Sequence, residues 1–268
     1  MIKKWMICST AVLTCALAAQ AYDAQEFMRQ YKDTISIVET NYTHNLPISG
    51  YEREQLFKKE FLMRAAEFGP KELLDKVLSL ATSPMQIVQE DRLGRTALFY
   101  AANGEFVDSL LKRFLSLETA RGIKVGYAAM NEGPAAPGPK AQRFLNKKDD
   151  EGATALMILL RDGKTSAAER LLERGADPCV KDKDGVTPLH MAVLAAKDNN
   201  PDGLKILQKV LKACPQNITA QTKDGQAALT WANKSAFSQA YDMLSKAAEG
   251  KISVQKEKLS WEGKLRAL

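Results

Sequence analysis

Apolar residues recur three and four positions apart along much of the chain, and short polar segments that contain glycine separate the apolar runs. Runs of this kind begin at Phe61, Phe106, Ala167, Gly203 and Phe237, with charged residues between their leucines or methionines. That spacing places the apolar side chains on one face of a helix. The pattern therefore predicts an all-α chain built from short amphipathic helices.

A polar pattern precedes several of these helices and occurs four times. It reads DRLGRTALFYAA from Asp91, DDEGATALMILL from Asp149, DKDGVTPLHMAV from Asp182 and TKDGQAALTWAN from Thr222. The shared glycines are spaced 58, 33 and 40 residues apart, at Gly94, Gly152, Gly185 and Gly225. Glycine takes the positive φ of a tight turn, threonine caps a helix, and proline suits the first helical position. Each copy therefore predicts a turn followed by a helix.

The 33-residue step, which leads to T-P-L-H-M-A from Thr187, resembles the ankyrin repeat. The resemblance covers residues 51–248 and implies a solenoid of about five helix-turn-helix units with β-turn fingers and helical terminal caps. The match is strongest from Leu145 to Cys214, and the outer units depart from it. Structural roles are implied for the four turn glycines and for Thr96, Thr154, Thr187, Pro188 and His190. His190 would bridge the turn and neighbouring backbone.

Other segments lie outside the regular repeat. A glycine- and proline-rich insertion predicts a long surface loop at about 116–143, and AAKDNNPDG from Ala195 predicts a solvated turn. Residues 22–50 are expected to form an N-terminal helical segment that covers one end of the stack. The tail, residues 249–268, either folds back as a short amphipathic helix or binds a partner.

Residues 1–21 have the three-part layout of a secretory signal peptide. Two lysines precede an apolar run that ends at Ala19-Gln20-Ala21, which predicts cleavage after Ala21. An uncleaved anchor and lipidation at Cys15 stay open as alternatives. Cleavage removes two lysines and no acids, so it lowers the formal net charge from +6 to +4. We expect an exported protein that is periplasmic or, alternatively, secreted.

Two of the four cysteines, Cys179 and Cys214, lie beyond the predicted signal peptide. In a compartment that we expect to be oxidising, they either form a disulfide or remain two small buried apolar residues. The sequence does not decide between these alternatives, because a disulfide depends on the distance between the two residues in the fold.

Composition and motifs exclude several classes of function. The 38 basic and 32 acidic residues are interspersed, so no basic block indicates nucleic-acid binding. No segment after the signal peptide is apolar for long enough to span a membrane. No nucleophile elbow, paired-histidine metal helix or phosphate-binding glycine loop is present. We therefore expect no catalytic, cofactor or metal site.

The resemblance implies a protein partner, of unknown identity, bound by the concave face of fingers and inner helices. Finger residues not needed for the turn are the candidates, although each alone could equally be a solvated surface residue: Arg92, Arg95, Glu151, Lys183, Val186, Lys223 and Gln226. We expect a monomeric, exported scaffold or adaptor without catalysis of its own. A secreted effector that binds a host protein and an enzyme with a site in the inserted loop are the alternatives.

Overall fold

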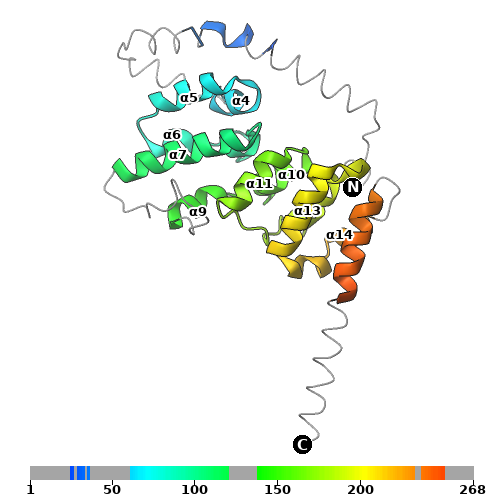
Figure 1. Cartoon of the computed structure of the whole chain (residues 1–268). Coiled ribbons are helices and arrows are strands. Elements are labelled where there is room, and N and C mark those ends of the chain that lie inside the picture. Colours follow the sequence, from blue (N-terminus) through cyan, green and yellow to red (C-terminus); the bar gives the residue numbers. More distant parts are fainter. Residues whose placement is uncertain are drawn as a thin grey trace, which may run out of the picture.

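The computed structural model describes residues 25–26, 29–33, 35–36, 61–120, 138–232 and 237–250. Within these residues the chain is helical, and its extended backbone contacts are limited to isolated bridges (Figure 1). The helices stack in pairs, each with an inner and an outer helix. The predicted all-α solenoid of ankyrin-like units is confirmed.

Five helix pairs follow one another along the described part of the stack. In each pair the inner helix comes first: α4 (Phe61–Phe68) with α5 (Lys71–Leu80), η2 (Ala97–Tyr100) with α7 (Gly104–Ala120), α10 (Ala155–Arg161) with α11 (Thr165–Glu173), α12 (Pro188–Ala195) with α13 (Pro201–Ala213), and α14 (Ala228–Ala232) with helical residues 238–250. Successive inner helices contact one another from α4 to α14, and successive outer helices do so from α5 to α13. Two layers therefore run through the stack.

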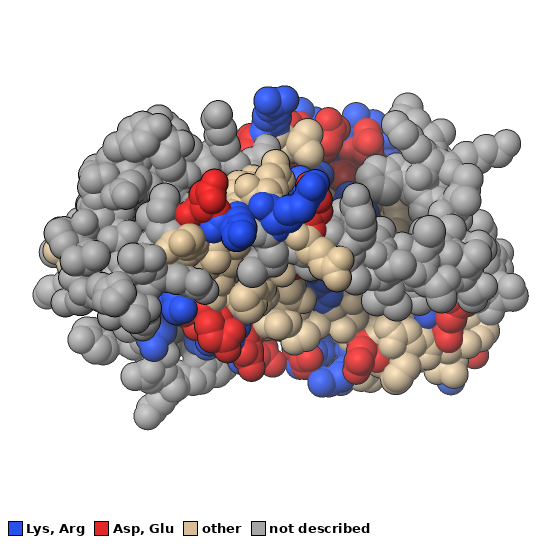
Figure 2. Space-filling model, turned by 90° about the horizontal axis from the view of Figure 1, so that it is seen from above, with Lys and Arg blue, Asp and Glu red and all other residues tan. Residues whose placement is uncertain are grey.

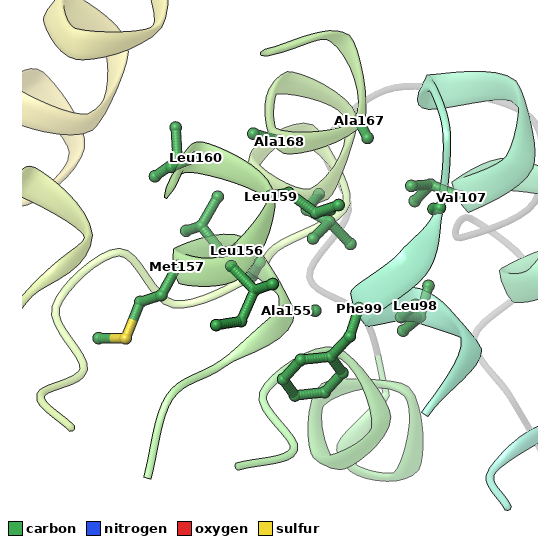
Figure 3. Close-up of a cluster of buried hydrophobic side chains, with 14 of the residues drawn as sticks. Leu98, Phe99, Val107, Ala155, Leu156, Met157, Leu159, Leu160, Ala167 and Ala168 are labelled. Carbon is green, nitrogen blue, oxygen red and sulfur yellow. The ribbon is translucent and has the colours of Figure 1, made fainter. Parts of the chain in front are cut away.

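The core lies between these two layers, and its centre is α10. Every residue from Ala155 to Leu160 is buried, because η2, α11 and α12 surround this helix. Figure 3 shows Leu156 and Leu159 of α10 in the cluster that includes Phe99 of η2. The small residues Ala167 and Ala168 of α11 are also buried there, which allows the two helices of the pair to approach closely.

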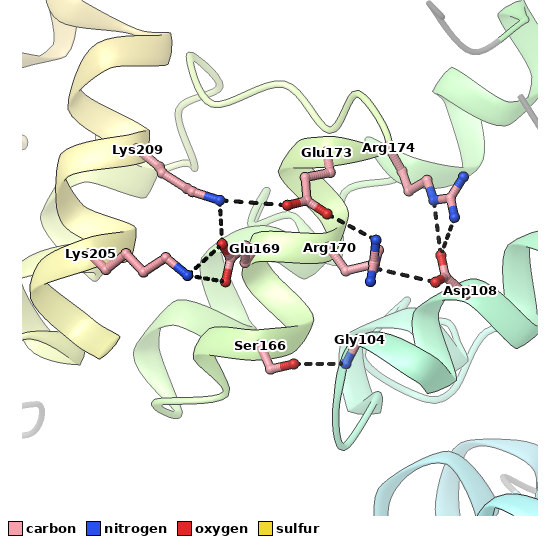
Figure 4. A network of polar contacts seen from close by, with 9 residues as sticks. All are labelled: Gly104, Asp108, Ser166, Glu169, Arg170, Glu173, Arg174, Lys205 and Lys209. Atoms are coloured by element: carbon pink, nitrogen blue, oxygen red, sulfur yellow. Dashed lines mark hydrogen bonds and ion pairs between the residues drawn. The ribbon is translucent and has the colours of Figure 1, made fainter. Parts of the chain in front are cut away.

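Charged residues join the outer helices across the surface (Figure 4). Arg174, directly after α11, pairs with Asp108 of α7 at 2.8 Å between Nη2 and Oδ1. Glu169 of α11 pairs with Lys205 and Lys209 of α13. Hydrogen bonds from these two lysines lower the pKa of the Glu169 carboxyl. Exposed pairs contribute only about 0.2–1 kcal/mol each, so the ladder of charges supplements the apolar core.

The inserted segment is narrower than the loop predicted at 116–143. Helix α7 continues to Ala120, and α9 (Pro139–Leu145) begins before the predicted end. The prediction was wrong at both edges, because SLETA from Ser116 contains no helix-breaking residue and Pro139 begins a helix. Residues 121–137 lie outside the described residues. Lys140 of α9 pairs with the buried Glu118 of α7 at 2.6 Å, which holds the two edges together.

A small part of the N-terminal segment packs on the first unit. The rings of Tyr31 and Phe61 lie 5.0 Å apart between centroids, and Ile35 is buried in the core. The predicted signal peptide at 1–21 and most of the tail at 249–268 lie outside the described residues. Among the helices of the described ranges, none has the length and apolar character needed to cross a membrane.

Candidate protein-binding face

Four tight turns precede the inner helices of the last four pairs, and we call them the fingers: residues 91–95, 149–153, 182–186 and 222–226. In the first three fingers an aspartate begins the turn. Its Oδ1 accepts backbone N–H groups from two and four residues later, at 2.8–3.0 Å. In the last finger Thr222 Oγ1 accepts the Gln226 N–H at 3.2 Å. Sequence reasoning missed this role, which an aspartate three residues before each of the first three finger glycines signals.

The finger glycines adopt the left-handed conformation that favours glycine. Their φ values are 72° at Gly94, 80° at Gly152, 78° at Gly185 and 72° at Gly225. At the first three, the next finger leaves no room for a side chain: a Cβ at Gly152 would lie 3.0 Å from Lys183 N. A Cβ at Gly225 would meet no atom within 4 Å. The last finger therefore has an open flank in the described structure.

Backbone hydrogen bonds join the fingers into a continuous row. Leu93 O accepts from Asp150 N at 2.9 Å, and Glu151 O accepts from Lys183 N at 3.0 Å. The third link runs from Lys223 N to Asp184 O at 2.8 Å. In each link the third residue of one finger accepts from the second residue of the next. The fingers are therefore in register, and the insertion between the first two does not break the row.

Three buried threonines stand directly before the inner helices, and their environments differ. Thr96 Oγ1 and Thr154 Oγ1 have no hydrogen-bond partner, although both side chains are buried. Thr187 Oγ1 lies 2.9 Å from His190 Nδ1. The equivalents of His190 after the other two threonines are Phe99, which has no acceptor, and Met157, whose thioether sulfur is only a weak one. The threonine side chain is therefore hydrogen-bonded only where a histidine follows three residues later.

His190 links the fourth helix pair to the last finger. Its side chain is fully buried, and its Nδ1 accepts the Thr187 N–H at 3.3 Å, which places the ring proton on Nε2. Nε2 lies 3.1 Å from Gln226 O, so it donates to the last finger. The rings of His190 and Trp231 pack in a T-shaped arrangement, with 5.1 Å between centroids. Burial lowers the pKa of His190 to about 4, so the imidazole is neutral near pH 7 and holds two units together.

Four of the predicted partner-binding residues lie at the finger tips, which we define as the second and third residues of each finger. Arg92, Glu151, Lys183 and Lys223 are all exposed there. Lys223 pairs with Asp184 of the preceding finger at 3.4 Å, and both side chains remain more than half exposed. These four positions are available to a partner.

The other three predicted residues are each the fifth residue of a finger, and they face the protein. Arg95 Nε pairs with Asp149 Oδ2 at 2.9 Å, and the side chains are only 16% and 1% exposed. Val186 is buried, and Gln226 is partly buried with its carbonyl against His190. Here the prediction needs correction, because the end of each turn packs against neighbouring structure. These residues hold the row together and offer little surface to a partner.

Sequence reasoning missed four exposed tip residues. Leu93 is 51% exposed at the third position of the first finger, where the other fingers carry an acid. Asp150, Asp184 and Asp224 are exposed acids of the second, third and fourth fingers. Comparing equivalent turn positions across the four copies would have found all four. Figure 2 shows that basic and acidic side chains intermingle on the described surface it presents.

A disulfide joins Cys179, ahead of the third finger, to Cys214 at the end of α13. Beside it, Asn217 Nδ2 donates to Pro178 O at 3.0 Å. The covalent bond and this hydrogen bond fix the segments that lead into the third and fourth fingers. Of the two alternatives that the sequence left open, the structure contains the disulfide.

No group of three metal-binding side chains gathers within the described ranges.

Comparison with known proteins identifies similarity in the repeat region of the chain. The family described as ankyrin repeats (3 copies) matches residues 126–209. The Neurogenic locus Notch protein of Drosophila melanogaster is 36% identical over 89 residues, 33% of this chain and 3% of that protein.

Two further Notch relatives match a similar length of the chain. Neurogenic locus notch homolog protein 4 of Homo sapiens is 38% identical over 78 residues, 29% of this chain and 4% of that protein. Neurogenic locus notch homolog protein 1 of Mus musculus is 37% identical over 84 residues, 31% of this chain and 3% of that protein. This chain thus spans only 3–4% of the length of these relatives, so the similarity concerns a short stretch of them.

Proposed function

We propose that this chain, which is an ankyrin-repeat protein, is a scaffold that binds a partner protein through the tips of its finger row. Ankyrin repeats bind proteins and are typically non-catalytic, and we extend both properties to this chain. The observation that carries the proposal is the register of the row: exposed charged tips stand at equivalent positions of hydrogen-bonded turns. A partner would meet a fixed pattern of charge.

The row is suited to binding because it is ordered before a partner arrives. Glycine geometry, the aspartate hydrogen bonds and the links between fingers hold the backbone of the tips. A preorganised surface loses less conformational entropy on binding than a flexible loop does. Charges at the rim of an interface contribute mainly to partner selection and association rate. We therefore expect selectivity to reside in tip charges such as Arg92, Glu151 and Lys183.

We further propose that the protein is exported and works in the periplasm, with secretion as the alternative destination. The signal-peptide pattern of residues 1–21 supports export. The Cys179–Cys214 disulfide supports it independently, since such bonds persist in oxidising compartments. Intact-mass measurement of the chain from each cell fraction tests both points. A chain that starts at Tyr22 in the periplasmic fraction supports the proposal, and a full-length chain in the cytoplasm contradicts it.

Affinity capture from the native compartment tests the binding proposal. The tip variant carries Arg92→Glu and Lys183→Glu, two exposed positions whose side chains form no ion pair within the described structure. Arg95 is unsuitable, because reversing it would place a carboxylate beside buried Asp149. A matched control carries Lys112→Glu and Lys212→Glu on the outer helices.

The expected result is a partner that wild type and the control retain and that the tip variant loses. Capture that is equal for all three proteins would show that the tips do not bind the partner. Loss of capture in the outer-helix control alone would show that the partner binds the layer of outer helices. Far-UV circular dichroism of each variant checks that its fold is intact.

A further inference from the structure

We infer that the finger row binds a second copy of this chain, with the two rows antiparallel and related by a two-fold axis. The inference rests on the proposed function, because it names a partner for the same finger tips. It differs from the monomer expected from sequence. The structure suggests a dimer because of the order of unpaired charges along the row. That order can be determined only when the register of the fingers is known.

Five exposed tip side chains carry charge and form no ion pair in the described part of the chain. They are Arg92 in the first finger, Asp150 and Glu151 in the second, Lys183 in the third and Asp224 in the fourth. The remaining two charged tips, Asp184 and Lys223, pair with each other and cancel. From the first finger to the fourth, the unpaired charge is therefore positive, negative, positive and negative.

This order is complementary to its own reverse. When a second row runs antiparallel, the first finger of one copy meets the fourth finger of the other, and the second meets the third. Arg92 then faces Asp224 of the other copy, and Asp150 with Glu151 faces Lys183 of the other copy. A two-fold axis makes every such contact occur twice, as in the isologous interfaces of most homodimers.

The same charges disfavour the parallel alternative. In a parallel pairing each finger faces its own equivalent, so Arg92 meets Arg92, Asp150 and Glu151 meet Asp150 and Glu151, and Lys183 meets Lys183. Like charges placed opposite one another across an interface are strongly unfavourable. The charge order therefore selects one relative orientation of the two rows.

Apolar surface is present at the ends of the antiparallel arrangement. Leu93, an exposed apolar side chain of the first finger, would lie toward the fourth finger of the other copy. The end contacts thus combine a charge pair with an exposed leucine. A dimer of this kind covers the tips, so it would compete with any other partner of the row.

Sedimentation velocity of the purified chain at low and high salt, over a range of concentrations, tests the inference. One variant, Asp150→Lys with Glu151→Lys, makes the second finger positive. The other, Lys183→Glu, makes the third finger negative. Lysine already occupies the second turn position at Lys183 and Lys223, and the substitutions leave the backbone links between fingers in place. Lys112→Glu on α7 is the control.

The wild type and the Lys112→Glu control should form dimers that high salt weakens. Each tip variant alone should lose roughly tenfold or more in self-affinity, because like charges then meet twice across the axis. Mixing the two variants should restore a dimer, since the positive second finger of one faces the negative third finger of the other. Loss of self-affinity in each variant, together with recovery in the mixture, is the pattern expected when the second finger of one copy faces the third finger of the other.

A wild type that sediments as a monomer at every concentration overturns the inference. So do tip variants that dimerise as well as wild type, or a mixture that does not recover. The proposed function is tested separately by the capture experiment. A monomeric wild type whose partner is lost with Arg92→Glu and Lys183→Glu would refute self-association and leave the scaffold function standing. A wild type that dimerises, but whose captured partners do not depend on the tips, would support self-association and contradict the scaffold function.

Discussion

Protonation of His190 should destabilise the protein in mildly acidic solution, and the structure allows the size of the effect to be worked out. Burial lowers the pKa of this imidazole from its usual 6.5 to about 4 in the folded chain. Protonation would put a proton on Nδ1, which accepts the Thr187 N–H, and a charge in a fully buried site. Lys181 adds a small repulsion. The folded state therefore resists the proton that the unfolded state binds.

The direction follows from which state binds the proton. Well above pH 6.5 both states are neutral, and the contribution of the histidine to stability is complete. As the pH falls from 6.5 toward 4 the unfolded chain gains a proton that the folded chain lacks, so the free energy of unfolding falls. The loss is about 2 kcal/mol at about pH 5 and about 3 kcal/mol at about pH 4.

Urea unfolding of wild type and His190→Gln, followed by circular dichroism near pH 7 and pH 5, measures this contribution. The carboxyl groups titrate in both proteins, so the difference between their pH dependences isolates the imidazole. We expect wild type to lose about 2 kcal/mol more than the variant. Equal losses in the two proteins would refute the assignment of a buried neutral imidazole.

Three further predictions concern the finger row and its supports. Gly152→Ala should lower the free energy of unfolding by about 1–2 kcal/mol because of the positive φ, and by a further amount because the new Cβ meets the next finger, whereas Gly225→Ala should show only the loss from the positive φ. Equal losses of melting temperature in the two variants would contradict the close contact at Gly152. Thr154→Val should leave stability unchanged or raise it, since its hydroxyl has no partner, while Thr187→Val should cost about 1–2 kcal/mol. Urea titrations that rank the two variants the other way would count against the hydrogen bond between Thr187 and His190. Cys179→Ser should lower stability by about 2–4 kcal/mol, because the bond closes a separation of 35 residues; a wild-type melting temperature that is indifferent to reductant would show that the bond is absent.

The turns and helices could be predicted because their causes are local. A glycine such as Gly185 is recognisable from the Asp-Gly pair and the helix that follows, and its φ of 78° is what the turn requires. The same holds for leucines at helical spacing, which fill the core. The repeat then supplied the order of the pairs, because each unit can bury its apolar face only against a neighbour.

The direction of individual finger side chains could not be predicted, because it depends on the next finger. Arg95 and Lys183 both read as charged surface residues, yet only Arg95 meets a buried carboxylate, Asp149, more than fifty residues away. The disulfide likewise depends on the approach of Cys179 to Cys214 across α13. The true edge of the insertion depended on how far the apolar face of α7 continues, and Leu117 on that face is buried.

Site-specific photo-crosslinking in the native compartment tests the central claim most directly. A photoreactive residue would replace Lys183 at a finger tip and, in a matched protein, Lys212 on the outer helix α13. The account predicts a discrete crosslinked protein from position 183, whether a second copy or another partner, and none from position 212. Crosslinks from position 212 alone, or from neither position, would contradict the claim that the finger tips are the binding surface.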